Sequence, residues 1–277
     1  MSNAESPHAT ERLTPIGRLT DSIIERRMGR FIAELVLIVA GILIALAIDG
    51  WVNAAQDRQT EKTYLEFLVR DVEQIRARAQ AQIDFETNKV ATATRAYQVL
   101  SLPDPAAHKA VLAETLGKLS TRQTLILNSA TYDQVVNSGD LQLIRNPLLR
   151  DELVRYFDRM ERYERIAEKN NRDLIDYVYI PFMMRAGITP RGEANPIVGT
   201  LSRANQLLAE QLGADPAYPE DRVLSAPPDA DSWNDIRRNV FFRARISAVG
   251  LAIAEAILAE SDEMSAALAE ELENGRE

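Results

Sequence analysis

The sequence predicts an all-α protein in which one N-terminal transmembrane helix is followed by an elongated antiparallel helical bundle. Three observations support this fold class. An uninterrupted apolar run occupies Leu35–Ile48, and apolar residues recur every three or four positions over three later segments. Glycine contributes only 12 residues, and alternating strand-like patterns are scarce. We therefore expect a cytoplasmic tail over residues 1–30, a transmembrane helix over 31–52 and a helical extracytoplasmic domain over 53–277.

The apolar run is long enough to cross a bilayer once it is widened to Phe31–Val52. At ~1.5 Å per residue, roughly 22 residues span a hydrocarbon core of about 30 Å. Only Glu34 and Asp49 interrupt it, one near each end. Two alternatives remain open. Ala45-Leu46-Ala47 resembles the small-residue site of a cleaved signal peptide, and a run of this length also occurs in buried core helices.

The charges that flank the run predict its orientation. Arg26, Arg27 and Arg30 precede it directly, whereas Asp49 and Asp57 follow it. Because basic flanks stay in the cytoplasm, we expect a cytoplasmic amino terminus and an extracytoplasmic carboxyl-terminal domain.

Four residues of the run share one helical stripe, and we treat them as candidate helix contacts in the membrane: Glu34, Gly41, Ala45 and Asp49. A small-xxx-small pair such as Gly41 and Ala45 lets two membrane helices approach closely. We therefore expect a homo-oligomer or a complex with another membrane protein, in addition to the lipid bilayer as a partner. Glu34 lies about one turn from the cytoplasmic edge, where it either contacts a partner helix or reaches the lipid headgroups.

The stretch from Glu34 to Trp51, followed by Tyr64-Leu65, resembles the opening of an uncharacterised bacterial family of single-pass membrane proteins with the signature E-x-x-L-x-x-x-G-I-L-I-A-L-x-I-[DN]-x-W. A second block is also similar to the family pattern, at residues 131–134 and 138–146. The resemblance covers roughly residues 26–165. It implies an uncleaved anchor in the bacterial inner membrane with a periplasmic domain, and it transfers no catalytic residues.

Beyond the anchor, the sequence predicts further helices in succession. The first continues to about residue 100 along an apolar line of Leu65, Leu68, Val72, Ile75, Ala79, Ile83, Val90, Ala93, Tyr97 and Leu100. Short helices are expected over 106–120 and 131–138. Thr131 with Gln134 forms a capping-box pattern at the start of the second, and Gly139 is a natural stop.

The clearest helix signal begins at Asn146-Pro147, because Asn is a good N-cap and Pro suits the first helical position. Its apolar line has spacings that alternate between three and four, as in a coiled coil: Leu149, Leu153, Tyr156, Met160, Tyr163, Ala167, Asn170, Leu174 and Tyr177. Asn170 is a candidate buried polar residue, either an amide that fixes helix register or a ligand contact.

Residues 187–231 hold half of the prolines of the chain, and we interpret them as a long connection that contains a short helix near 201–212. The last helix is expected over about 233–271, with Ser232 and Asp235 at its start. Its inward residues are predicted to be Ile236, Val240, Ile246, Val249, Ile253 and Ile257.

Composition excludes several function classes. The chain has no cysteine, and its formal net charge of −9 argues against nucleic acid as a partner. Its two histidines, His8 and His108, lack the companion ligands of a zinc or di-iron site. No phosphate-binding loop or dinucleotide fingerprint occurs. We expect no catalytic residues, no metal and no cofactor, and hence no enzyme.

The sequence therefore indicates a membrane-anchored helical scaffold or interaction protein that associates with itself. The alternative is an extracytoplasmic sensor domain that binds a small ligand between bundle helices. This alternative predicts an internal pocket lined by a few polar groups, including Asn170.

Overall fold

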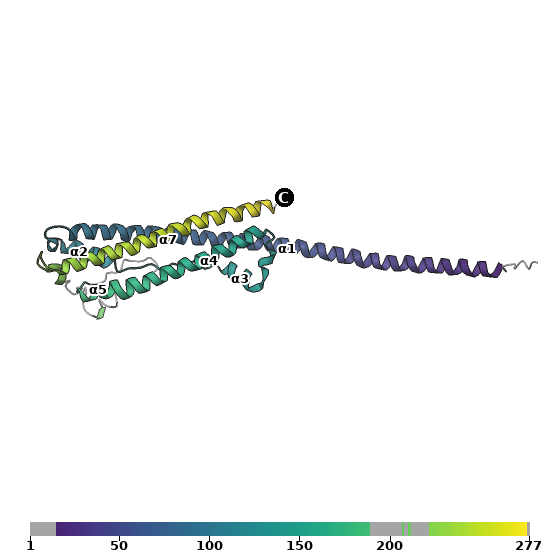
Figure 1. Ribbon diagram of the computed structural model, residues 1–277, viewed down its shortest axis with the longest axis horizontal. Coiled ribbons are helices and arrows are strands. Elements are labelled where there is room, and N and C mark those ends of the chain that lie inside the picture. Colours follow the sequence, from purple (N-terminus) through teal and green to yellow (C-terminus); the bar gives the residue numbers. More distant parts are fainter. Residues whose placement is uncertain (1–14, 189–206, 208–209, 212–221, 276–277) are drawn as a thin grey trace, which may run out of the picture. The chain divides into compact units, whose positions relative to one another are not determined.

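The computed structural model describes residues 15–188, 207, 210–211 and 222–275, with side chains from Glu34 onward. Every regular element in these residues is helical, and no strand occurs among them (Figure 1). The predicted all-α fold class is therefore confirmed. Most of the proline-rich connection, including the helix expected near residues 201–212, lies outside the described residues.

The chain divides into two units, residues 1–60 and residues 61–277. Helix α1 (Pro15–Leu100) contributes residues to both. In the first unit, every side chain from Glu34 to Ala54 is exposed. The apolar window within Glu34–Leu100 is long and apolar enough to cross a membrane, and none of it is buried. A signal sequence meets the same criteria of length and composition, whereas the core helix of a soluble protein is mostly buried, unlike this window.

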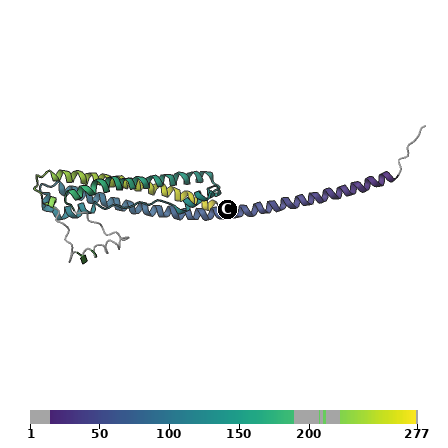
Figure 2. The same ribbon diagram turned by 90° about the horizontal axis from the view of Figure 1, so that it is seen from below.

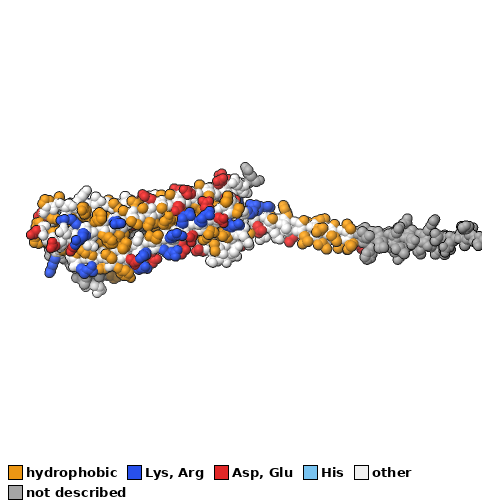
Figure 3. All heavy atoms as spheres, in the orientation of Figure 1, with side chains coloured by type: hydrophobic (Ala, Val, Ile, Leu, Met, Phe, Trp, Pro, Cys, Tyr) orange, Lys and Arg blue, Asp and Glu red, His pale blue; other side chains and the backbone are white. Residues whose placement is uncertain are grey.

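The second unit is a bundle that contains all the remaining elements. They are η1 (Pro105–His108), α2 (Lys109–Lys118), α3 (Ala130–Ser138), η2 (Asp140–Leu143), α4 (Pro147–Asn170), the π-helical segment η3 (Asn171–Tyr179), α5 (Ile180–Arg185), η4 (Arg222–Ser225) and α7 (Ser232–Asn274). Figures 1 and 2 show α4 and α7 side by side with the bundle part of α1. Charged side chains of both signs are spread over the visible face of the bundle in Figure 3.

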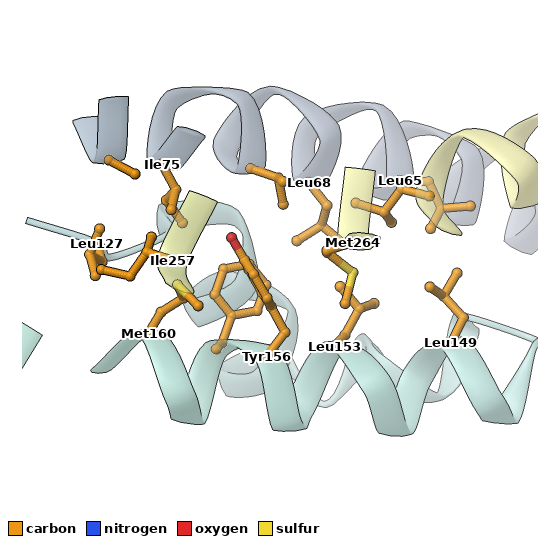
Figure 4. Close-up of a cluster of buried hydrophobic side chains, with 14 of the residues drawn as sticks. Leu65, Leu68, Ile75, Leu127, Leu149, Leu153, Tyr156, Met160, Ile257 and Met264 are labelled. Carbon is orange, nitrogen blue, oxygen red and sulfur yellow. The ribbon is translucent and has the colours of Figure 1, made fainter. Parts of the chain in front are cut away.

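Two apolar clusters hold the bundle together. One joins the early bundle residues of α1 to the start of α4 and the end of α7, and it contains Leu65, Leu153 and Met264 (Figure 4). The other joins the end of α1 to α5 and the start of α7, through Leu100, Met183 and Trp233. Consequently α1 and α4 run in the same direction, and α7 is antiparallel to both.

Because α1 and α4 are parallel, the connection between them must return along the bundle. Residues 101–146 do so, and polar contacts attach them to α1. The Ser129 hydroxyl donates to Asp71 at 2.6 Å, and the Tyr64 hydroxyl donates to Asp140 at 2.7 Å. Near the end of the connection, buried Glu61 accepts from the backbone N–H of Arg145 at 2.7 Å.

Helix starts agree with the sequence at α4 and differ at α3 and α7. The Asn146 side chain accepts from Leu148 N and Leu149 N, as predicted for an N-cap before Pro147. At α3 the helix begins at Ala130, so the cap is Ser129, which accepts from Tyr132 N, and the predicted Thr131 pattern does not form the cap; the Thr131 N–H donates to Asp71. At α7 the helix already includes Ser232, and its cap, Asp231, makes no side-chain bond. Gly139 adopts the predicted left-handed conformation, with φ of 79°.

The π-helical segment η3 shifts the buried face of the third helical stretch. The predicted line reaches Leu174 and Tyr177, but the buried residues are Ile175 and Tyr179, and Tyr177 is 68% exposed. A π-helix closes its hydrogen bonds over one more residue than an α-helix, so the inward positions move along the chain. The prediction of Tyr177 as a core residue was therefore wrong.

Candidate functional site

The four candidate membrane-contact residues lie on the exposed part of α1. Glu34, Gly41, Ala45 and Asp49 are all exposed. A Cβ added at Gly41 would meet no atom within 4 Å. Asp49 accepts from Asn53 Nδ2 of the next turn at 3.5 Å. Within the described chain, this stripe is therefore open to a second molecule.

Asn170 is half-buried, not fully buried as the sequence indicated. It is the last residue of α4, directly before the π-helical segment that displaces the seam. It lines a small, partly open cavity together with Gln82 and Glu86 of α1 and Gly250 of α7. The sequence thus placed an amide near the interior, and the structure puts it beside buried polar residues that the sequence analysis did not identify.

These residues form a polar layer between the two apolar clusters. We use this name for Gln82, Glu86 and Lys89 of α1 and Arg243 and Ser247 of α7, all of which are buried. Lys89, Arg243 and Ser247 have no exposed surface at all. Buried charged side chains are unfavourable unless they are paired or hydrogen-bonded, so each needs an account of its partners.

The two cations of the polar layer, Lys89 and Arg243, donate hydrogen bonds to carbonyl groups at the carboxyl end of α2. Arg243 donates from Nε to Leu119 O at 2.9 Å and from Nη2 to Thr121 O at 3.1 Å. Lys89 Nζ donates to Lys118 O at 3.0 Å. The last carbonyls of a helix have no partner within the helix and carry partial negative charge, which favours cations there. Burial lowers the pKa of Arg243, while the negative charge of Glu86 opposes that change.

The acid of the layer, Glu86, is held close to the backbone of α7. A Cβ at Gly250 would lie 2.8 Å from Glu86 Oε1, so only glycine permits this approach. Gln82 Nε2 donates to the same Oε1 at 2.9 Å. Burial raises the pKa of the Glu86 carboxyl; the Ser247 hydroxyl, Arg243, Gln82 and Lys89 oppose that rise without cancelling it.

A signal in the sequence could have identified this layer. Along α1 from Leu65 to Leu100, consecutive buried residues are separated alternately by three and four positions. This spacing includes residues 82, 86 and 89. The same order in α7 passes through residues 243, 247 and 250. The sequence analysis instead followed apolar side chains to Ile83, Val90 and Tyr97, and Tyr97 is 44% exposed. Continuing the heptad spacing through polar residues would have located the layer.

Two openings differ greatly in size. The cavity beside Asn170 has a volume of about 20 Å³, close to that of one water molecule. A surface groove of about 430 Å³ lies between the segment before α3 and helix α4. Its walls combine apolar side chains such as Tyr132, Val154 and Phe157 with several carboxylates. Among the described residues, no three potential metal ligands come together.

Comparisons with known proteins give one match. The model of a family of unknown function (DUF6090) matches residues 34–177. No curated protein and no solved structure matches the chain. The matched stretch begins at Glu34, contains all of α4 and ends within the π-helical segment, so it excludes α7.

Proposed function

The chain belongs to the family of unknown function DUF6090, whose model covers just over half of it, and we propose that it is a membrane-anchored helical interaction protein that associates with itself. The family match agrees with the uncharacterised family indicated by the sequence. It assigns no activity, so the proposal depends on the physical properties of the exposed apolar segment and of the bundle.

The observation that carries the proposal is the exposure of the segment from Leu35 to Val52. Leu37 is 74% exposed and Trp51 is 69% exposed, and the apolar residues between them are exposed on all sides. Burying a large apolar side chain is favourable by about 1.5–3 kcal/mol. A soluble monomer rarely leaves a continuous apolar surface of this kind in water. A bilayer supplies the missing apolar surroundings.

Charge asymmetry supports the proposed orientation. Arg26, Arg27 and Arg30 precede the segment, and no basic residue follows until Arg58. By the positive-inside rule, the amino terminus faces the cytoplasm of a bacterial cell and the bundle faces the periplasm.

A topology experiment tests the anchor and its orientation together. Alkaline phosphatase and a fluorescent protein are fused in turn after Trp51 and after the carboxyl terminus. We expect active phosphatase and no fluorescence at both positions, with the chain in the membrane fraction. Fluorescence at both positions contradicts the orientation. An intact mass that lacks every residue up to Ala47 shows a cleaved leader instead of an anchor.

The stripe of Gly41 and Ala45 supports self-association. The space beside Gly41 is empty, which lets a second helix approach the backbone, as small residues do in membrane helix pairs. Glu34 and Asp49 lie on the same stripe and can donate or accept hydrogen bonds between helices when their surroundings are apolar.

A membrane two-hybrid assay tests this contact. Replacing Gly41 and Ala45 with Leu is expected to weaken association, because the larger side chains keep the backbones apart. Ala47→Leu is the matched control, since position 47 lies on the opposite side of the helix, and association should persist. Equal signals from all three chains contradict the proposed contact face.

The size of the cavity at Asn170 bears on the alternative of a small-ligand sensor. Organic ligands occupy pockets of about 300–1,000 Å³. The cavity at Asn170, of about 20 Å³, is an order of magnitude too small for one. A ligand at Asn170 is therefore not proposed, whereas the surface groove of about 430 Å³ falls within that range of volumes. The interaction function comes first because the exposed apolar segment supports it, and no catalytic activity forms part of the proposal.

A further inference from the structure

Two buried oxygen atoms of the polar layer receive no hydrogen bond. Gln82 Oε1 and Glu86 Oε2 are inaccessible to solvent, and neither has a donor within hydrogen-bond geometry among the described residues. The two side chains are 5% and 7% exposed. Leaving a buried acceptor unpaired is unfavourable, and leaving a buried carboxylate unpaired is more so. In this arrangement the two atoms lack a donor, although the Ser247 hydroxyl faces the same carboxyl group.

The chemistry of the two side chains shows what that donor can be. They are already joined on one side, where Gln82 Nε2 donates to Glu86 Oε1 at 2.9 Å. The atoms left over are the carbonyl oxygen of the amide and the second oxygen of the carboxyl group. A protonated carboxyl group has one O–H donor, and an amide oxygen accepts. A proton on Glu86 Oε2 makes that oxygen a donor to Gln82 Oε1, so that both atoms then take part in a hydrogen bond.

The surroundings disfavour a metal or ammonium cation in the same place. From α7, Arg243 and Ser247 face the carboxyl group, and Lys89 lies one turn further along α1. The cavity side presents the amides of Asn170 and Asn171 with apolar residues. A metal ion or an ammonium group needs more ligand or acceptor atoms than the two oxygens that lack a donor here. The cavity of about 20 Å³ leaves room for one water molecule as the competing donor.

We propose that Gln82 and Glu86 form a buried binding site for a single proton, which Glu86 holds as a neutral carboxylic acid and donates to Gln82 Oε1. Gly250 is part of the site, because a side chain there would displace the carboxyl group. The inference depends on the bundle alone, so it stands or fails separately from the proposed membrane function.

The site makes the stability of the bundle depend on pH in a defined direction. Burial, the largest effect, raises the pKa of Glu86 above its ordinary value of 4.5. The folded chain therefore holds the proton more tightly than the unfolded chain. The resulting stabilisation is complete below the ordinary pKa and is lost as the pH rises through the folded pKa. The bundle should be more stable in mild acid than at neutral pH.

Urea unfolding of the full-length chain in detergent tests this dependence between about pH 5 and pH 8. The midpoint of the wild-type chain should fall as the pH rises. Glu86→Gln should abolish most of that fall and have the higher midpoint near pH 8, because its amide keeps a donor opposite Gln82 Oε1 without a proton to lose. A wild-type midpoint that does not change, or an equal fall in Glu86→Gln, overturns the proposal.

Glu61→Gln is the matched control. Glu61 is another buried carboxylate of α1, but Arg145 donates to both of its oxygens, at 2.7 and 2.6 Å. This variant should have a lower midpoint at every pH while it keeps the fall seen in the wild-type chain.

Infrared spectroscopy of the wild-type chain gives a test that does not require the variant to fold. A protonated carboxyl group has a carbonyl stretch distinct from the bands of a carboxylate. We expect this band in mild acid in the wild-type chain and in Glu61→Gln, and its loss in Glu86→Gln. Its absence from the wild-type chain in mild acid means that Glu86 is ionised and that water supplies the donor, which overturns the proposal.

Discussion

Residues 34–52 and residues 61–100 both belong to helix α1, yet they meet their surroundings in opposite ways. In the first segment no apolar side chain is buried, and Leu43 is 60% exposed. In the second, one face of the helix carries almost fully buried apolar residues, with Leu68 at 1% and Val72 at 0% exposure, while Phe67 and Tyr97 lie outside it and are exposed. Helix geometry is common to both, so the difference comes from the arrangement of apolar residues around the helix.

That difference shows which surroundings each segment requires. A helix that is apolar on all sides cannot bury its whole surface against one neighbouring helix. A helix with a single apolar stripe can bury that stripe against a bundle. Residues 61–100 find their apolar partners within the chain, in α4, α5 and α7. Residues 34–52 find none among the described residues, and this exposure is the basis of the membrane anchor proposed above.

Matched truncations give the largest expected contrast between the two segments. Leu68→Ala removes a buried side chain from the first apolar cluster and should lower the free energy of unfolding by about 2–5 kcal/mol. Leu43→Ala removes an exposed side chain and should leave the unfolding of the bundle unchanged. Chemical denaturation of both variants in detergent measures the contrast. Equal losses would mean that residues 34–52 also contribute to the stability of the bundle.

A smaller effect is expected at the polar boundary between the two segments. Glu61 is the first residue of the bundle unit, and it accepts two charge-assisted hydrogen bonds from Arg145. Glu61→Gln should lower the free energy of unfolding by ~1.5–3 kcal/mol, because hydrogen bonds to a charged group are stronger than neutral ones. Asp158→Asn, which affects an exposed pair with Arg162, is the control and should have no measurable effect. If the two variants unfold alike, Arg145 does not stabilise this end of the bundle.

The N-cap of α4 should contribute less to the free energy of unfolding than Glu61 does. Asn146 accepts from two backbone N–H groups at the start of α4, and its amide donates to Glu271 of α7 at 2.6 Å. Asn146→Ala should cost about 1–2 kcal/mol in unfolding free energy, since the N-cap and one contact between helices are lost together. Asn137→Ala, an exposed position, should unfold like the wild-type chain. Restoration by Asn146→Asp would identify the cap as the source of the effect, and failure to restore would identify the Glu271 contact.

Much of this fold could be predicted because local chemistry determines it. The apolar run around Leu43 needs no tertiary information, and the pair Asn146-Pro147 defines a helix start by its own side chain and ring. The seam of α4 was also correct as far as Met160, because a regular α-helix keeps its period.

The rest depends on contacts between distant residues. No local pattern in residues 171–179 indicated a π-helix. This π-helix moves the buried face from Tyr177 to Tyr179. The polar layer does not follow from an apolar periodicity, because its buried positions carry polar and charged side chains. Arg243 is buried because the end of α2, more than 100 residues earlier in the chain, presents carbonyls that need donors. The direction of α4 likewise depends on the whole connection over residues 101–146.

The smallest effect is expected at Tyr156, which lies in the cluster that covers Leu68. Its hydroxyl lies 2.8 Å from the Ser261 hydroxyl. Ser261 also donates to Ile257 O, so it keeps a partner when the tyrosine hydroxyl is removed. Tyr156→Phe should therefore cost only about 0.5–1.5 kcal/mol in unfolding free energy at neutral pH.

The pH dependence of this small loss distinguishes a buried hydroxyl from an exposed one. Burial raises the pKa of Tyr156 from 10.0 to about 12. Because the unfolded chain loses this proton first, the hydroxyl stabilises the fold fully below the ordinary pKa, and that stabilisation is lost as the pH rises towards the folded value. The wild-type chain should thus lose its advantage over Tyr156→Phe in alkali, where urea unfolding of the two chains would converge. A constant difference across that range would mean that the Tyr156 hydroxyl ionises as easily in the folded chain as in the unfolded one, and that this part of the cluster is exposed, as the side chains of residues 34–52 are.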